Sequence, residues 1–374
     1  MTTFRIGCES VYDRVGILFA QLGTPDEPTT SALRRYLKEF LSDPRVIEVN
    51  RFFWWLLLNG IILRTRPRRS ARLYSRVWTS EGSPLLLTTK LQAEGVATRL
   101  RNHGFSDVVV AYGMRYGNPN LNLGVDQLIK AGCRRILLVP LYPQYAAATT
   151  ASTYDAVFRR LLRERWIPTL RVAEPYYRDS RFISALAGSV NRQLATLPVP
   201  ADRLILSYHG IPVRYVQKGD PYCCECVETT TRLMPFLEYP RERIVSTFQS
   251  RFGREQWLVP YTDETIEKLA EQDGVKHLAV ACPGFSSDCL ETIDEIGHEA
   301  KELFLEKGGT SLTLIRCLND EPQWLDALTD IVLDNLHGWI LPNVECKQEL
   351  NCDISCPARA CGLTTFPNKD RSGD

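Results

Sequence analysis

Short apolar runs alternate with longer amphipathic stretches along most of the chain. Five of the runs have the length and composition of buried strands: VGILFAQLG, DVVVAYGM, RRILLVPLYP, RLILSYHG and KHLAVACPG. Strands that are apolar on both faces and separated by helical stretches are typical of a parallel sheet covered by helices. The pattern therefore predicts an α/β fold of the doubly wound type.

The strand pattern occurs twice. ILFAQLGTP resembles LILSYHGIP, and RRILLVPLYPQYAAATT resembles KHLAVACPGFSSDCLET. The second pair is separated by fewer residues than the first, which indicates extra sequence in the first copy, around residues 51–90. We therefore predict two similar doubly wound halves and a short cysteine-rich tail, over residues 14–180, 181–342 and 343–374.

The stretch PGFSSDCLETIDEIGHE (the acidic segment, residues 283–299) gathers carboxylates with no cation among them. It contains Asp288, Glu291, Asp294, Glu295 and Glu299. On one interpretation it is an amphipathic surface helix with solvated acids, in which Asp288 and Glu291 form a capping box at the start. On the other interpretation the acids line a functional site.

His209 favours the functional interpretation. It ends a predicted strand in the same half of the chain as the acidic segment. Ligands of doubly wound folds bind beyond the carboxyl ends of the strands, so we expect His209 and the acidic segment to face one cleft. An imidazole opposite several carboxylates can hold a divalent cation, transfer protons, or do both.

Bulk composition excludes several classes of protein. The 374 residues include 45 basic and 44 acidic side chains, a balance that does not suggest a nucleic-acid partner. Residues 1–15 contain no apolar signal region, and the longest apolar run, residues 52–63, is too short to span a bilayer. The sequence therefore predicts a cytoplasmic protein.

The extra sequence of the first half (the lip, residues 51–90) is aromatic at its start and basic afterwards. The large apolar side chains from Phe52 to Leu58 suit a large, flat, apolar ligand at a cleft entrance. The arginines that follow suit carboxylates on the rim of such a ligand, or form a solvated basic loop; they are Arg64, Arg66, Arg68, Arg69, Arg72 and Arg76. We also expect the lip to make peripheral contact with a membrane surface, such as the inner membrane.

Six motifs resemble those of the ferrochelatases, the family that inserts ferrous iron into a porphyrin. They are LGTP, GMRYGNP, YPQY, LSYHGIP, GDPY and PGFSSDCLETIDEI, and they occur in the family's order from about Val15 to Asn343. The resemblance implies two Rossmann-like domains (a chelatase fold) with the active site between them. It implies Fe²⁺ and a porphyrin as substrates, with haem and two protons as products. Protoporphyrin IX is favoured over coproporphyrin III, and the resemblance allows a homodimer.

Two other functions remain open. One is a cobalt or nickel chelatase for another tetrapyrrole, although such chelatases commonly lack the full lip and the GDPY segment. The other is a haem- or iron-sensing binding protein that retains the chelatase fold, against which the intact His209 and Glu291 argue. No nucleotide is expected, because LGTPDEP lacks the glycine spacing of a dinucleotide site.

The resemblance implies roles for individual residues. His209 stands at the family's essential histidine and Glu291 at its active-site glutamate, so both would meet the iron or the pyrrole protons. Asp288, Glu295 and Glu299 match the carboxylates that accompany that glutamate. Contacts with the porphyrin are implied at Leu22, Arg66, Ser83, Arg115, Tyr116, Tyr142 and Tyr145.

Four cysteines lie close together in the tail: Cys346, Cys352, Cys356 and Cys361. Such a group in a reducing compartment is typical of a metal site, with zinc, an iron–sulfur cluster and free thiols as the alternatives. The resemblance favours a [2Fe–2S] cluster, which many ferrochelatases bind through a C-terminal extension. Animal-type members take one ligand from just after YPQY, where this chain has alanines, so the tail would supply all four. Cys223, Cys224 and Cys226 are expected to be structural.

Overall fold

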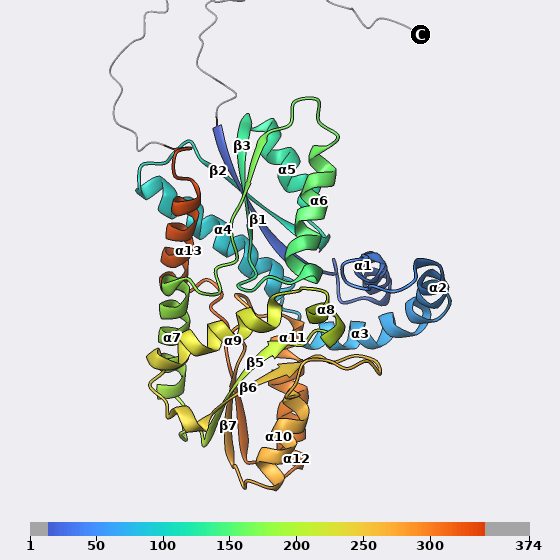
Figure 1. Ribbon diagram of the computed structural model, residues 1–374, viewed down its shortest axis with the longest axis vertical. Helices are drawn as coiled ribbons and strands as arrows, with labels where there is room; N and C mark the ends of the chain where they lie inside the picture. Colours follow the sequence, from blue (N-terminus) through green and yellow to red (C-terminus); the bar gives the residue numbers. More distant parts are fainter. Residues whose placement is uncertain (1–13, 341–374) are drawn as a thin grey trace, which may run out of the picture.

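Two four-stranded parallel sheets form the framework of the protein, whose computed structural model describes residues 14–340 (Figure 1). The first sheet has the order β2-β1-β3-β4 and the second the order β6-β5-β7-β8. The strands are β1 (Arg14–Thr24), β2 (Val109–Gly117), β3 (Cys133–Pro140), β4 (Thr169–Val172), β5 (Arg203–His209), β6 (Ile244–Gln249), β7 (His277–Ala281) and β8 (Ser311–Ile315).

Helices cover both sheets and connect their strands. In the N-terminal part they are α1 (Thr30–Ser42), α2 (Arg51–Leu57), η1 (Leu58–Ile62), α3 (Leu63–Val77), α4 (Pro84–Asn102), α5 (Leu121–Lys130), η2 (Ala147–Ala151) and α6 (Ser152–Leu161). In the C-terminal part they are α7 (Ser180–Ala195), α8 (Val213–Gln217), α9 (Tyr222–Leu233), η3 (Met234–Phe236), η4 (Arg241–Arg243), α10 (Thr262–Glu271), α11 (Leu290–Ile293), η5 (Glu295–Ala300), α12 (Lys301–Glu306) and α13 (Pro322–Asn335).

The two sheets repeat one strand order, which confirms the doubly wound α/β fold predicted from the sequence. β1 and β5 occupy equivalent positions, and so do β3 and β7, as the paired sequence motifs indicate. The strands β4, β6 and β8 were not predicted. β6 has the sequence IVSTFQ and β8 the sequence SLTLI, and polar residues interrupt the apolar run that marks a buried strand.

The carboxyl ends of β1 and β2 approach each other closely near the middle of the molecule. Gly23 at the end of β1 has a φ of 119°, and a Cβ there would lie 1.8 Å from the carbonyl oxygen of Tyr116. Only glycine fits such a position, because any side chain would overlap the neighbouring backbone. The glycine of the LGTP motif therefore allows the end of β1 to pack directly against the backbone of β2.

Side chains from both sheets share the largest hydrophobic core. It contains Ile17 and Phe19 of β1 together with Leu204 and Leu206 of β5. The last helix, α13, packs against α4 and α7 and so returns to the first half of the chain (Figure 1). The predicted domain boundary near residue 180 stays a prediction.

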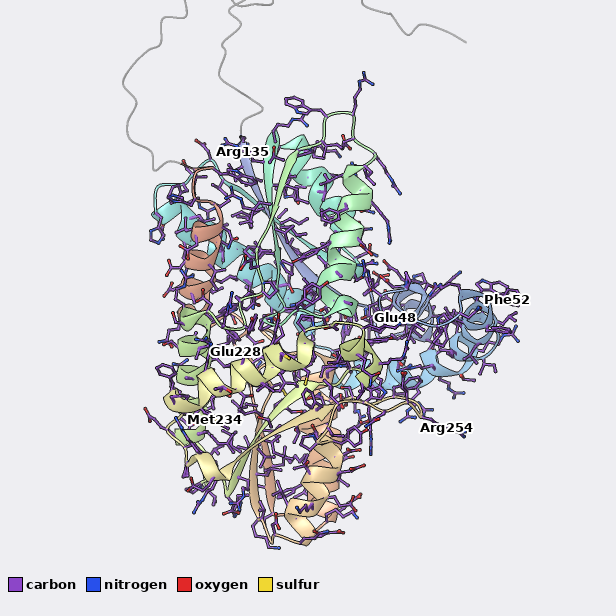
Figure 2. All side chains as sticks on the ribbon, viewed as in Figure 1. Glu48, Phe52, Arg135, Glu228, Met234 and Arg254 are labelled. Carbon is purple, nitrogen blue, oxygen red and sulfur yellow. The ribbon has the colours of Figure 1, made fainter. Side chains whose placement is uncertain are left out.

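The lip projects from one side of the molecule as α2, η1 and α3 (Figure 1). The sequence predicts that the apolar side chains from Phe52 to Leu58 form one exposed patch, but they do not all face solvent. Phe52 lies at the outer end of the lip (Figure 2) and is 66% exposed. Trp55 is 60% exposed, whereas Leu58 is 2% exposed. Trp54 also turns inward, and its Nε1–H donates to the carbonyl oxygen of Leu41 at 2.7 Å. The helical period divides this run between the core and the surface.

No helix between residues 14 and 340 combines the length and the apolar character needed to cross a membrane.

Candidate active site

His209 is the last residue of β5, at the carboxyl edge of the second sheet. It is partly buried and pairs in register with Gln249, the last residue of the neighbouring strand β6. Nδ1 lies 2.7 Å from the carbonyl oxygen of Gly210. Since a carbonyl only accepts, Nδ1 carries the proton, and the neutral ring keeps its lone pair on Nε2. The backbone thereby fixes the tautomer that can accept a proton or bind a metal.

The acidic segment follows β7 but is not one regular helix. α11 runs through Leu290–Ile293, a π-helical stretch follows at Glu295–Ala300, and α12 continues from Lys301. The capping box joins Cys289 and Thr292, not Asp288 and Glu291. The Cys289 N–H donates to the Thr292 hydroxyl at 3.0 Å. The predicted cap is wrong because the Asp288 carboxylate is used elsewhere.

Asp288 is 3% exposed and holds the loop that follows β8. Its carboxylate accepts from Asn319 Nδ2 at 2.8 Å, from the Cys317 N–H at 3.2 Å and from Arg316 Nε at 3.3 Å. The Thr292 hydroxyl donates a fourth bond at 3.2 Å. Asp288 is therefore saturated with donors, and its contacts are those of a structural carboxylate.

Arg76 of the lip supplies a cation to the acidic segment, so the stripe of unpaired acids expected from the sequence is incorrect. Its Nε lies 2.9 Å from Asp294 Oδ1, and its Nη2 lies 3.6 Å from Glu299 Oε1. Burial raises the pKa of Asp294, and the charge of Arg76 partly offsets this. The cation is distant in sequence, which is why the segment reads as unpaired in isolation.

Two carboxylates of the segment, Glu291 and Glu295, keep a capacity for chemistry. Glu295 is partly buried, and burial raises the pKa of its carboxyl above the usual range. A hydrogen bond from Ser250 and the electrostatic interaction with His209 lower that pKa, whereas the charge of Glu291 raises it. A carboxyl with a raised pKa binds a proton more readily than an ordinary carboxyl and can therefore serve in proton transfer.

Glu291 faces the first half of the protein. Burial raises the pKa of Tyr36 and of Tyr74, and the charge of Glu291 adds to the effect in both. Tyr36 and Tyr74 belong to a hydrophobic cluster that also contains Leu22, near the end of β1, and Leu290 of α11. Leu22 therefore packs in the apolar cluster that adjoins the acidic segment, where the sequence predicts a contact with a flat ligand.

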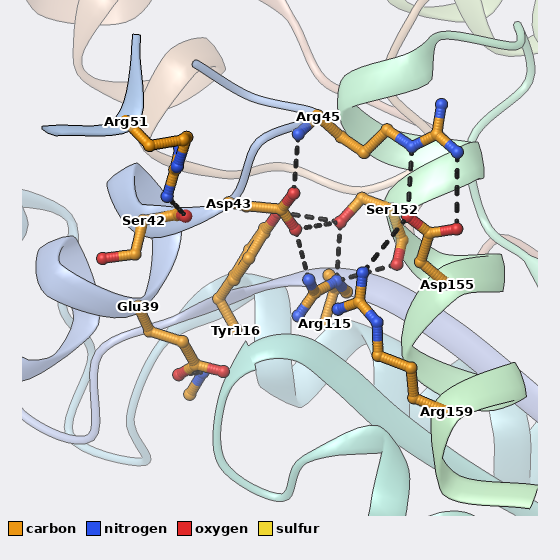
Figure 3. A network of polar contacts seen from close by, with 11 residues as sticks. Glu39, Ser42, Asp43, Arg45, Arg51, Arg115, Tyr116, Ser152, Asp155 and Arg159 are labelled. Atoms are coloured by element: carbon orange, nitrogen blue, oxygen red, sulfur yellow. Dashed lines mark hydrogen bonds and ion pairs between the residues drawn. The ribbon is translucent and has the colours of Figure 1, made fainter. Parts of the chain in front are cut away.

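Arg115 and Tyr116, predicted as ligand contacts, are held in a buried polar network (Figure 3). Arg115 forms an ion pair with Asp43, and its Nε donates to the Ser152 hydroxyl at 2.6 Å. The Tyr116 hydroxyl donates to Asp43 at 2.9 Å and is fully buried. Their polar groups are thus occupied by Asp43, the residue after α1, and by Ser152 of α6, and only the ring of Tyr116 contributes to the cluster around Leu22.

The remaining predicted contacts are placed differently from one another. Arg66 is exposed, and its guanidinium lies 4.8 Å from the ring centroid of Phe252, so the lip reaches the loop after β6. Ser83 is buried at the start of α4. The Tyr142 hydroxyl is buried, and burial raises its pKa. Tyr145 is partly buried, and its N–H donates to Glu225 at 2.6 Å.

The described cysteines are reduced and do not gather into a ligand set. Cys224 is exposed, Cys223 is partly buried and Cys226 is buried on α9. Cys346, Cys352, Cys356 and Cys361 lie outside the described residues. Within residues 14–340, no group of three or more His, Cys, Asp or Glu side chains is arranged to hold a metal ion.

Two site residues have no counterpart among the sequence predictions. Gln249 and Ser250 both contact Glu295, Gln249 through Nε2 at 3.2 Å and Ser250 through its hydroxyl at 2.5 Å. They lie at the end of β6, the strand whose pattern was not recognised. One indirect signal could have pointed to them: in a parallel sheet, the strand next to β5 must end at the same edge as His209.

The site as a whole lies between the two halves. His209, whose Nδ1 is bound to the backbone, interacts electrostatically with the Glu295 carboxylate, and Glu291 interacts with Tyr36 of the apolar cluster in the first half. An imidazole and carboxylates of this kind can transfer protons and bind a cation.

Comparisons with known proteins agree with this chemistry. The family model described as Ferrochelatase matches residues 14–336. The ferrochelatase of Marinobacter nauticus is 50% identical over 330 residues, which cover 88% of this chain and 89% of that one. The ferrochelatase of Thioalkalivibrio sulfidiphilus is 50% identical over 351 residues, which cover 93% and 95%. The solved structure of SirB from Bacillus subtilis with Fe³⁺ is similar in fold, with a TM-score of 0.50, 14% identity and coverage of 86% and 95%.

Proposed function

The chain belongs to the ferrochelatase family, and from this premise we propose that His209, Glu291 and Glu295 carry out its reaction. The protein is an enzyme of haem synthesis that inserts Fe²⁺ into a porphyrin. Metallation must remove two pyrrole protons and strip the metal of most of its water. The observation that carries the assignment is the hydrogen bond from His209 Nδ1 to Gly210, which leaves Nε2 free.

We assign proton removal to His209 and Glu295. Nε2 of His209 accepts a pyrrole proton, and the resulting imidazolium is stabilised by the nearby Glu295 carboxylate. Because burial raises the pKa of Glu295, this carboxyl can in turn accept a proton and pass it to solvent. Glu291, which faces the apolar cluster of the first half, meets the arriving Fe²⁺.

Asp288 and Glu299 receive other roles in this proposal. Asp288 fixes the loops after β7 and β8, since all its contacts are structural donors. Glu299 is exposed and shares Arg76 with Asp294, so it belongs to the outer end of the acidic segment. The proposed substrate is protoporphyrin IX, whose carboxylates suit the exposed arginines of the lip.

The lip supports two further proposals. Its exposed side chains, including Phe52, Phe53 and Trp55, suit peripheral contact with a membrane, from which an apolar porphyrin would be received. We therefore propose a cytoplasmic enzyme that binds at the inner membrane surface. The neighbouring arginines suit anionic headgroups. A homodimer stays a prediction.

The tail supports a [2Fe–2S] cluster. Cys346, Cys352, Cys356 and Cys361 provide four thiolates, the number of ligands that such a cluster needs. The cluster would supply an electron-transfer or sensing group, and no step of metallation needs it. Zinc is the alternative ligand of the same four thiolates.

Metallation by the purified protein tests the proposal. Wild-type protein with Fe²⁺ and protoporphyrin IX should convert the porphyrin spectrum into that of a haem, with coproporphyrin III as the second substrate. His209→Ala should lower kcat by at least about 100-fold, the contribution of a positioned acid–base group, without a change in porphyrin affinity. His277→Ala is the matched control, because His277 begins β7 and contacts Ser311 at 2.9 Å. Wild-type turnover of His209→Ala would show that the histidine is structural.

A further inference from the structure

A chain of buried polar side chains leads from the interior of the second sheet to Glu295. Gln249, 3% exposed, stands at its centre. Its Oε1 accepts from the Ser207 hydroxyl at 2.7 Å, and its Nε2 donates to the Glu291 carbonyl oxygen at 2.7 Å and to Glu295 Oε2 at 3.2 Å. Both amide protons are therefore used, and the amide has one orientation that satisfies its neighbours.

The direction of the chain follows from counting protons. Ser207 has a single hydroxyl proton and gives it to Gln249, so Thr262, 2.9 Å away, must donate to Ser207. Thr262 has then given its own proton, so Thr247, 2.8 Å away, donates to Thr262. These hydroxyls are all buried. Every hydrogen bond in the row thus points toward the Glu295 carboxylate, and successive bonds in one direction strengthen each other.

Ser250 completes the arrangement from the residue after β6. Its φ is 66°, in the left-handed region that residues other than glycine rarely adopt. Its hydroxyl donates to Glu295 Oε2 at 2.5 Å. A side chain held in this conformation costs free energy, and glycine would relieve that cost. Glycine would lack the hydroxyl that donates this hydrogen bond to Glu295.

Both donors converge on one oxygen of Glu295. Oε2 accepts hydrogen bonds from Gln249 Nε2 and from the Ser250 hydroxyl, and no described residue between 14 and 340 donates a hydrogen bond to Oε1. A carboxylate with one oxygen anchored cannot rotate freely, so the open oxygen keeps a fixed direction. His209 ends the strand next to Gln249, in register with it, so the same edge of the sheet orients both groups.

We propose that Gln249 and Ser250 are positioning residues that anchor Glu295 through Oε2 and leave Oε1 as the oriented proton acceptor. The inference rests on the proposed function of Glu295 in proton removal. Neither residue touches the reacting atoms in this account. Their contribution is the orientation of a carboxylate on the π-helical stretch η5, whose own backbone hydrogen bonds do not fix the side chain.

Ser250→Gly separates positioning from structural support. Glycine removes the backbone cost at φ 66°, which offsets the loss of the hydrogen bond to Glu295, so the melting temperature should stay close to that of the wild type. If the hydroxyl positions Glu295, kcat should nevertheless fall about tenfold, the effect of losing one hydrogen bond to a charged group. The KM values for Fe²⁺ and porphyrin should stay within about twofold, since substrate binding is not involved.

Two further variants make the test decisive. Ser246→Ala removes a hydroxyl from β6, the strand that precedes Ser250, where Ser246 contacts Thr230 at 3.3 Å, and should leave kcat unchanged. Ser250→Gly added to Glu295→Gln should cost nothing beyond Glu295→Gln alone, because the two residues act as one unit. Wild-type kcat in Ser250→Gly, or additive losses in the double variant, would overturn the inference. Wild-type kcat in Glu295→Gln would instead overturn the proposed function of Glu295.

Discussion

Arg76 of the lip and Asp294 of the acidic segment form an ion pair, with 2.9 Å between Nε and Oδ1. The arginine side chain is 40% exposed and the aspartate side chain is 3% exposed. A partly exposed cation of the lip therefore pairs with a buried carboxylate of the acidic segment. The lip is therefore anchored to the second half of the protein by charge as well as by packing.

Arg76→Ala should destabilise the protein by about 1–2 kcal/mol at neutral pH, because it leaves a buried carboxylate without its cation in a pair that is partly open to solvent. Burial raises the folded-state pKa of Asp294, so its ionisation opposes folding, and stability falls as the pH rises through that pKa. Removing Arg76 raises the pKa further. The destabilisation should thus be small near pH 4 and complete near pH 7.

Urea unfolding of both proteins at the two pH values measures this dependence. Arg72→Ala is the matched control, since Arg72 is an exposed arginine one turn earlier on α3. An equal loss at both pH values would mean that Arg76 acts through packing of its apolar stem, and the electrostatic account of the lip anchor would be wrong.

Asp288→Ala should lower stability by about 2–4 kcal/mol, the usual range for a buried network left unsatisfied. Asn319 Nδ2 and the Cys317 N–H both lose their acceptor in this variant. Asn319→Ala breaks the same network from the other side, so the double variant should cost much less than the sum. Chemical denaturation of the two single variants and the double variant measures the coupling free energy between Asp288 and Asn319.

Activity separates the two interpretations of Asp288. The folded fraction of Asp288→Ala should still metallate porphyrin with a KM for Fe²⁺ near that of the wild type. A stable variant with no activity would return Asp288 to the group of catalytic carboxylates that the sequence resemblance implies.

The contrast between Asp288 and Glu295 shows what the sequence could and could not predict. Apolar periodicity and the repeated motifs were sufficient for the fold, because buried strands and glycine turns leave local signals in the residues themselves. The His209 assignment also succeeded in placing the histidine at a strand end, since that depends on topology. The partners of a carboxylate depend on distant residues, such as Arg316 for Asp288 and Arg76 for Asp294. No local pattern contains them.

Strand β6 illustrates the same limit. It is polar partly because Thr247 and Gln249 belong to the hydrogen-bonded row behind Glu295. The polarity that hides this strand from a hydrophobic pattern is the property that gives it a place in the site. The strand that the sequence pattern missed therefore lies directly beside the Glu295 carboxylate.

The exposed face of the lip should carry membrane contact. Phe53→Ser combined with Trp55→Ser removes two side chains that are 69% and 60% exposed, and should reduce binding to vesicles that contain anionic phospholipid by about tenfold or more. Stability should change little, because neither side chain belongs to the core. Co-sedimentation with vesicles and a melting curve measure the two quantities.

Trp54→Ser provides the opposite case on the same helix. Trp54 donates to the Leu41 carbonyl oxygen and packs inward, so its loss should lower stability. Undiminished vesicle binding by the Phe53 and Trp55 double variant would mean that the exposed apolar side chains serve the porphyrin or another partner, and the membrane proposal would fail.

The tail should make the purified protein coloured before any porphyrin is added. Anaerobic preparation should yield about two irons and two labile sulfides per chain, the composition of one [2Fe–2S] cluster. Serine at Cys346, Cys352, Cys356 or Cys361 should bleach the visible absorption, because each thiolate would be one of the four ligands of the proposed cluster. Serine at Cys224, which is exposed on α9, is the control and should leave the colour intact.

Cluster loss should also be visible in stability, since metal–thiolate bonds formed only in the folded tail contribute to folding free energy. Metallation should continue in the bleached variants, because His209, Glu291 and Glu295 all lie within the two sheets and their helices, away from the tail in sequence. A colourless protein with one zinc per chain would replace the cluster by a zinc site on the same thiolates. Loss of metallation together with colour would instead show that the tail takes part in forming the active site.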